Sequence, residues 1–156
     1  MRPNKMTVVF CIEGNIGAGK STLMRDLKER MRGDESVVFV DEPVDEWKEH
    51  GFLGDMYSGR MSALAFQLVA LCSLASRMHR ALASRPRLVI AERSVWGNYP
   101  VFARANLSGR DLDTFRYCWE QTVSSMPRCR VFFVYLRQPV HVIMNRIRTR
   151  GRPEEQ

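Results

Sequence analysis

Four short runs of consecutive apolar residues divide the chain, and they predict β-strands. The runs cover residues 7–12, 36–40, 87–91 and 130–136. Each is rich in β-branched or aromatic residues and has no charged residue after its first position. An uninterrupted run of this kind is typical of a strand buried on both faces of a parallel sheet, because a half-exposed strand alternates apolar and polar residues.

The longer segments between these runs show the spacing of amphipathic helices. Apolar residues recur every three or four positions after the first run up to near Gly33, over 61–83, over 109–125, and after Pro139. Repeated alternation of strands and helices predicts a doubly wound parallel sheet with right-handed crossovers. We therefore expect a single α/β domain that covers residues 1–156.

The longest predicted helix has two distinct faces. Gln67 and Leu74, seven residues apart, share one face beside Phe66, where they are placed to line a pocket. The segment from Pro43 to Gly59 precedes this helix, and its polar composition favours a loop. The other face carries an apolar stripe that we expect to be mostly core, formed by Met61, Leu64, Leu68, Leu71, Ala75, Met78 and Leu82.

The composition fits one small domain that binds an anionic ligand. The 156 residues are 45% apolar, enough to cover a sheet with helices, and the formal net charge is +7. A basic chain can bind nucleic acid or a polyphosphate, and charge alone does not decide between them.

Four cysteines show no C-x-x-C spacing, so we expect reduced thiols. Six residues precede the first strand, and no apolar run approaches the ~20 residues that span a bilayer. We therefore expect a cytoplasmic protein without a signal, transit or membrane segment.

The segment between the first strand and the first helix has the spacing G-x-x-x-x-G-K-[ST], which is typical of a phosphate-binding P-loop. The glycines allow successive backbone N–H groups to face phosphates, and the helix N-terminus adds the positive end of its dipole. Lys20 would reach the β- and γ-phosphates, and the Ser21 hydroxyl would ligate Mg²⁺. The predicted nucleotide-binding residues are Gly14, Asn15, Ile16, Gly17, Ala18, Gly19, Lys20, Ser21 and Thr22.

Charged residues follow two other predicted strands at the same edge of the sheet. Glu42 follows the second run, and Glu92 and Arg93 follow the third. Open α/β sheets bind their ligands at this edge. Two carboxylates and an arginine beside a P-loop indicate a small-molecule kinase, whose chemistry is positioning and charge neutralisation. The guanine-binding N-K-x-D signature of switch proteins is absent from the sequence.

Five motifs, in this order, resemble those of the deoxynucleoside kinase family, which contains deoxycytidine, deoxyguanosine and mitochondrial-type thymidine kinases and an insect multisubstrate enzyme. The resemblance runs from the first strand to the last residue. It implies a P-loop NTPase-type fold, ATP with Mg²⁺ as the phosphoryl donor, and a deoxyribonucleoside as the acceptor. The motifs are IEGNIGAGKST at 12–22, Glu42-Pro43-Val44 with Trp47, Phe66-Gln67, Glu92-Arg93-Ser94-Val95, and the arginine-rich residues 146–156.

The resemblance implies catalytic roles for several of these residues. Glu42 corresponds to the family's general base on the sugar 5′-hydroxyl, and Arg93 to the arginine that holds this hydroxyl and the base. With Lys20 they form the expected catalytic set. Glu92 corresponds to a carboxylate near Mg²⁺, beside Ser21. The lid arginines that grip the donor phosphates are matched by Arg146, Arg150 and Arg152.

The expected nucleoside-binding residues follow from the same resemblance. Gln67 corresponds to the amide that bonds the nucleobase edge, and Trp47 and Phe102 to aromatic walls around the base. Tyr57 and Glu155 resemble the pair that binds the sugar 3′-hydroxyl, although the spacing from Tyr57 to Gln67 is one residue shorter than in the family. The full set is Glu42, Trp47, Tyr57, Phe66, Gln67, Leu74, Arg93, Asn98, Phe102 and Glu155.

Departures from the family pattern affect specificity and completeness. Relatives that favour deoxycytidine and purines have an arginine and an aspartate at the positions of Leu74 and Asn98, so we expect a more apolar wall and a pyrimidine preference. Relatives continue past the lid with another helix and a fifth strand, so we expect a sheet without its last strand. We also expect a homodimer through the helices over 61–83 and 109–125.

Alternative functions stay open at this stage. A nucleoside monophosphate kinase of the thymidylate type shares the P-loop and lid, but it would need basic residues where Glu42 stands. A truncated, non-catalytic nucleotide-binding remnant is a second alternative. A nucleic-acid-binding module is the least favoured, because phosphate binding accounts for the arginines and no aromatic residues interleave with them.

Overall fold

The computed structural model describes residues 6–150, which contain a four-stranded parallel sheet. The strand order is β2-β3-β1-β4, and Val9 of β1 lies opposite Val89 of β3 and Val131 of β4. The prediction of a parallel α/β sheet is confirmed. The strands are β1 (Val8–Gly14), β2 (Val37–Val40), β3 (Leu88–Glu92) and β4 (Arg130–Leu136).

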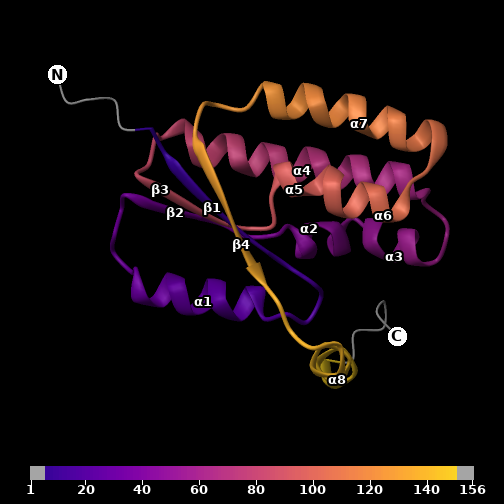
Figure 1. Ribbon diagram of the computed structural model, residues 1–156, viewed down its shortest axis with the longest axis horizontal. Helices are drawn as coiled ribbons and strands as arrows, with labels where there is room; N and C mark the ends of the chain where they lie inside the picture. Colours follow the sequence, from indigo (N-terminus) through magenta and orange to yellow (C-terminus); the bar gives the residue numbers. More distant parts are fainter. Residues whose placement is uncertain (1–5, 151–156) are drawn as a thin grey trace.

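Helices cover both faces of this sheet (Figure 1): α1 lies on one side, and α4 and α7 lie on the other. The fold is therefore doubly wound, as the alternation of strands and helices predicts. The helices are α1 (Lys20–Arg30), α2 (Val44–Glu49), α3 (Phe52–Tyr57), α4 (Ala63–Ala83), α5 (Val95–Gly97), the π-helix η1 (Asn98–Ala103), α6 (Arg104–Asn106), α7 (Gly109–Ser124) and α8 (Val140–Arg150).

The core is divided between the two faces because successive strand residues point in opposite directions. Cys11 and Val89 pack with Met78 of α4, whereas Ile12 and Ile90 pack with Met24 of α1. A further cluster joins α4 to α7 around the fully buried Phe115. The long amphipathic helix predicted over 61–83 therefore has its apolar stripe in the core, as expected.

The expectation of a loop between Pro43 and Gly59 is wrong, because this segment folds into α2 and α3. Trp47 is buried against Phe66 of α4, with ring centroids 5.5 Å apart and nearly perpendicular planes. Apolar residues from the segment 44–61 join this cluster, and the charged residues between them hide the helical spacing in the sequence. They are Val44, Phe52, Leu53, Met56 and Met61.

Among the described strands, β4 has an open edge and a largely exposed surface. Phe133 and Tyr135 are 56% and 67% exposed. Within residues 6–150, no helix has the length and apolarity needed to cross a membrane.

Candidate active site

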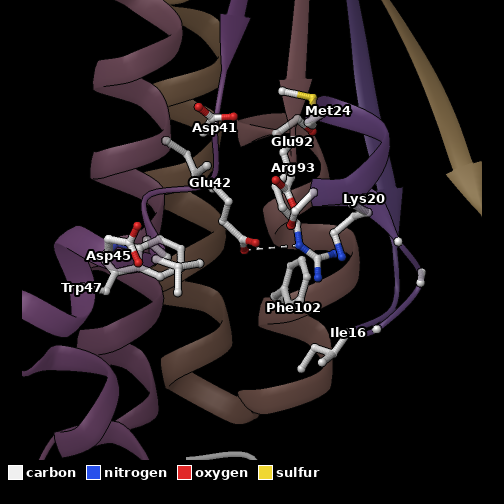
Figure 2. Close-up of a pocket in the computed structure, with 18 of the residues that line it drawn as sticks. Ile16, Lys20, Met24, Asp41, Glu42, Asp45, Trp47, Glu92, Arg93 and Phe102 are labelled. Atoms are coloured by element: carbon white, nitrogen blue, oxygen red, sulfur yellow. Dashed lines mark hydrogen bonds and ion pairs between the residues drawn. The ribbon is translucent and has the colours of Figure 1, made fainter. Parts of the chain in front are cut away.

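A cleft of about 1340 Å³ opens at the carboxyl ends of the strands. The P-loop, the residues that follow β2, the residues that follow β3, and α4 line it, so four segments far apart in the sequence meet there. Figure 2 shows that Lys20, Glu42 and Arg93 point into the same space from three different elements. This is the edge at which the sequence places the charged residues.

The P-loop depends on glycine where the backbone is most constrained. Gly14 has φ of +150°, and a Cβ there would lie 2.7 Å from the Leu136 carbonyl oxygen. Gly19, with φ of +99°, immediately precedes α1. Any larger residue at these positions would strain or displace the loop, so the turn that presents α1 to the cleft requires them.

Lys20 is the first residue of α1, and its side chain is buried. Its Nζ donates to the carbonyl oxygens of Gly14 and Asn15 at 3.1 and 3.0 Å. Burial lowers the pKa of Lys20, and the nearby Arg93 cation lowers it further. The ammonium is thus held over the loop, at the place where a P-loop lysine meets phosphate oxygens.

Next to Lys20, Ser21 and Glu92 bring two oxygen ligands together. The Ser21 hydroxyl donates to Oε1 of Glu92 at 2.7 Å. A hydroxyl and a carboxylate are hard ligands of the kind that Mg²⁺ prefers, and Mg²⁺ is usually held by one or two such groups together with substrate phosphates. The two residues predicted near a metal are therefore adjacent, and their chemistry fits this ion.

The side chains of Glu42 and Arg93 face each other across the cleft, as the dashed line in Figure 2 marks. Nε of Arg93 donates to Oε1 of Glu42 at 3.3 Å. Burial raises the pKa of Glu42, while the Arg93 and Lys20 cations oppose this shift. A carboxyl with a raised pKa is a stronger proton acceptor once it is ionised, so Glu42 has the properties of a general base.

Several contacts fix the position of Arg93. Its Nη1 donates to the Gly14 carbonyl oxygen at 2.8 Å, and its guanidinium carbon lies 4.4 Å from the centre of the Phe102 ring. Its backbone has a positive φ of 67°, a strained conformation for a residue with a side chain. Such strain is typical of functional sites, where surrounding contacts hold the residue in place.

Beyond Glu42 the cleft continues between α4 and the start of η1. Gln67 and Asn98 are buried there, and among the described residues Oε1 of Gln67 and Oδ1 of Asn98 accept no hydrogen bond. A buried polar atom without a partner is costly, so these oxygens favour a ligand with N–H donors. The expected nucleoside-binding residues that line the cleft are Glu42, Trp47, Tyr57, Phe66, Gln67, Leu74, Arg93, Asn98 and Phe102.

The lid arginines are only partly described. Nη1 of Arg146, in α8, donates to the Gly17 carbonyl oxygen at 3.0 Å, so this residue stands beside the P-loop as expected. Arg152 and Glu155 lie outside the described residues, and so does the side chain of Arg150.

One buried carboxylate in this region has no role in the sequence-based prediction. Glu13, near the end of β1, accepts a hydrogen bond from the Ser94 hydroxyl at 2.9 Å and lies 3.6 Å from Nη1 of Arg93. Its signal in the sequence is the same as that of Glu42, a carboxylate at the end of an apolar strand. Because Glu13 immediately precedes the P-loop motif, it is not distinguished from that motif as a separate carboxylate in the sequence.

Known proteins resemble this chain in sequence and in fold. The sequence model of the deoxynucleoside kinase family matches residues 10–156. Thymidine kinase of Ictalurid herpesvirus 1 (strain Auburn) is 33% identical over 160 residues, which cover 95% of this chain and 66% of that protein. Deoxyguanosine kinase of Bacillus subtilis (strain 168) is 26% identical over 151 residues, covering 94% and 68% of the two chains.

A solved structure shows the same fold. It is a deoxyadenosine kinase from M. mycoides with the products dCMP and dCDP bound. The TM-score is 0.70 at 22% identity, and the match covers 94% of this chain and 73% of that one. The matches cover about two thirds of the length of the thymidine kinase and of the deoxyguanosine kinase.

Proposed function

Because this chain belongs to the deoxynucleoside kinase family, we propose that it transfers the γ-phosphoryl group of ATP to the 5′-hydroxyl of a deoxyribonucleoside, a step of nucleotide salvage. The observation that carries the proposal is the placement of Glu42, 3.3 Å from Arg93, in one cleft with the P-loop. A base and a phosphate cradle in the same space provide for both reactants of a phosphoryl transfer.

Glu42 acts on the acceptor. Its carboxylate accepts the proton of the 5′-hydroxyl as that oxygen forms its bond to the γ-phosphorus. The bond between the γ-phosphorus and the β,γ-bridging oxygen breaks, and its electron pair leaves with ADP. The guanidinium of Arg93 is fixed by its contacts with Gly14 and Phe102. Because it stays in place when the substrate binds, Arg93 orients Glu42 and the hydroxyl.

The cations of the site act on the donor. Lys20 and the backbone of the P-loop neutralise the phosphate oxygens, and Arg146 approaches the same loop from α8. Ser21 and Glu92 would hold Mg²⁺, which would supply charge neutralisation of the donor phosphates. Arg150, Arg152 and Glu155 keep their expected roles as parts of this proposal.

The base pocket supports a pyrimidine preference. Leu74 gives its wall an apolar surface, and burial of a thymine 5-methyl group against such a wall stabilises the complex by up to about 1 kcal/mol. The amide of Gln67 offers a donor and an acceptor, so it can pair with thymine or cytosine. We propose that thymidine and deoxycytidine are both used and that deoxyguanosine is a poor substrate.

We place the reaction in the cytoplasm and assign no nucleic-acid or membrane partner. We further propose a homodimer through α4 and α7. α7 packs on α4 through the buried Phe115, and it exposes Tyr117 (65%) on its outer surface, where a second copy would bury it.

A coupled ADP-release assay with the four deoxynucleosides and with thymidine 5′-monophosphate tests the proposed function. ADP release that depends on a nucleoside supports it. Release with the monophosphate alone would instead identify a nucleoside monophosphate kinase. Nucleotide binding without any transfer would identify a non-catalytic protein.

A further inference from the structure

Glu13 lies directly beneath the cleft without lining it. Its side chain is 10% exposed, and both carboxylate oxygens are engaged. Oε1 accepts a hydrogen bond from Ser94, and Oε2 faces the guanidinium of Arg93. Burial of a carboxylate is costly unless it is paired, so this arrangement requires an explanation beyond the filling of space.

The surroundings of Glu13 are shaped to its carboxylate. A Cβ atom at Gly97 would lie 2.5 Å from Oε1 of Glu13, closer than any side chain can approach. The Ser94 hydroxyl, which donates to Glu13, also accepts a hydrogen bond from the Gly97 N–H at 2.9 Å. The start of α5 therefore closes around this carboxylate and fixes its position.

Two carboxylates share the single cation of Arg93. Glu42 faces Nε at 3.3 Å from the cleft, and Glu13 faces Nη1 at 3.6 Å from below. A guanidinium is planar and always charged, so the group that holds one edge determines where the other edge points. The strained backbone of Arg93 gives it little freedom to find another arrangement.

We propose that Glu13 is a positioning residue of the phosphoryl-transfer site: it holds Arg93 from below and shares its charge, so that Glu42 stays correctly oriented and basic. The inference rests on the proposed function for its kinetic consequences. Its structural part, the coupling of Glu13 to Glu42 through Arg93, is measurable without any reaction.

The groups around the two carboxylates give the direction of this coupling. The pKa of Glu42 is influenced by the charges of Arg93, Lys20 and Glu92. The pKa of Glu13 is influenced by the hydrogen bond from Ser94 and by the charges of Arg93 and Lys20. The neighbouring thiol of Cys11 stays neutral, since burial raises its pKa to about 12. Removal of the negative charge of Glu13 would leave the Arg93 cation acting mainly on Glu42, which lowers the pKa of Glu42 and makes it a weaker base.

Glu13→Gln tests the proposal, because the amide keeps the shape and still accepts from Ser94. We expect kcat to fall roughly 10- to 100-fold, since a misplacement of about 1 Å in a reacting group can cost about 100-fold. We also expect the acidic limb of the pH profile of kcat/KM to move to lower pH, because loss of a nearby negative charge lowers the pKa of Glu42. Glu46→Gln is the matched control, since it removes a carboxylate from the exposed pair with Arg77 outside the cleft.

Gly97→Ala provides a second variant in which Glu13 is intact. Gly97 has an ordinary φ of −77°, so the added methyl group strains no backbone and instead displaces the carboxylate. We expect the same changes as in Glu13→Gln but smaller. This variant decides the matter where Glu13→Gln does not fold.

Titration of the Glu42 side-chain carboxyl by ¹³C NMR, in the protein without substrates, separates this inference from the proposed function. A lower pKa of Glu42 in Glu13→Gln or Gly97→Ala supports the coupling, whether or not the wild type is active. A wild type that transfers no phosphoryl group would overturn only the proposed function. An active wild type whose pH profile and Glu42 titration stay unchanged in the folded variants would overturn the positioning role.

Discussion

Glu42 and Arg93, 51 residues apart, follow different strands and meet because β2 and β3 are adjacent in the parallel sheet. Their juxtaposition is predictable from sequence, since carboxyl ends of parallel strands share an edge. The role of Glu13 is not predictable in the same way. It depends on the path of α5, where Ser94 and Gly97 close around the carboxylate.

Glu42→Gln removes the proposed base and keeps its size. We expect kcat to fall roughly 100-fold or more, since this is the usual contribution of general-base help. Nucleoside binding, measured by calorimetry, should persist because the base pocket is untouched. Near-normal turnover with an unchanged pH dependence would show that Glu42 is not the base.

The pH dependence of activity follows from the direction in which the pKa of Glu42 is shifted. Burial raises the pKa of Glu42 above 4.5, and only the ionised carboxylate accepts a proton. As the pH falls through this raised pKa, kcat/KM should decline, so the acidic limb lies above pH 4.5. A profile that stays flat down to that pH would contradict the assignment.

The raised pKa of Glu42 should also make the stability of the fold depend on pH, but in the opposite direction to activity: stability should fall, not rise, with increasing pH. A raised folded-state pKa means that the native state binds the proton more tightly than the unfolded state does. The stability contributed by protonated Glu42 is therefore present at acidic pH and lost as the pH rises through the raised pKa. Thermal unfolding of the wild type and of Glu42→Gln across this range should show a pH-dependent difference, and parallel curves would argue against the shift.

The base pocket carries a prediction about substrate choice. With Leu74 and Asn98 in its wall, we expect kcat/KM to be higher for thymidine and deoxycytidine than for deoxyguanosine. Measurement with all four deoxynucleosides under one set of conditions decides this. A clear purine preference would show that these two residues do not set the wall of the pocket as proposed.

At the level of elements, long and strongly periodic segments were predictable and short ones were not. The strands and the helices α1, α4 and α7 follow from apolar runs and helical spacing. α2 and α3 have six residues each, too few for a clear period, and they are stabilised by the packing of Trp47 on Phe66 rather than by their own sequence. Trp47 and Tyr57, cleft residues that these helices carry, therefore depend on tertiary contacts for their positions.

Among the described strands, β4 combines an edge position with exposed apolar side chains, which favours unwanted association. An open edge with apolar side chains is a template for pairing with another chain. We expect concentration-dependent self-association, measured by static light scattering, that Phe133→Lys reduces. Tyr117→Lys on α7 separates the two interfaces, because it should remove the proposed dimer and leave the association through β4. Association that Phe133→Lys leaves unchanged would contradict the assignment to β4.

For the whole molecule, the sheet brings a nucleotide-binding loop, a carboxylate–arginine pair and an amide-lined pocket into one cleft. The order of these parts along the cleft matches the order of atoms from the donor phosphates through a 5′-hydroxyl to a nucleobase. Shared fold by itself does not establish this activity, since related folds support many reactions. The activity is established by showing which molecule receives the phosphoryl group.

Identification of the product made from γ-³²P-labelled ATP and thymidine is the decisive test of the proposed phosphoryl transfer. The wild-type protein should produce labelled thymidine 5′-monophosphate, and Glu42→Gln, prepared in parallel to exclude a contaminating kinase, should produce far less. Release of labelled inorganic phosphate without any labelled nucleotide product would contradict the proposed transfer. So would equal amounts of product from the two proteins.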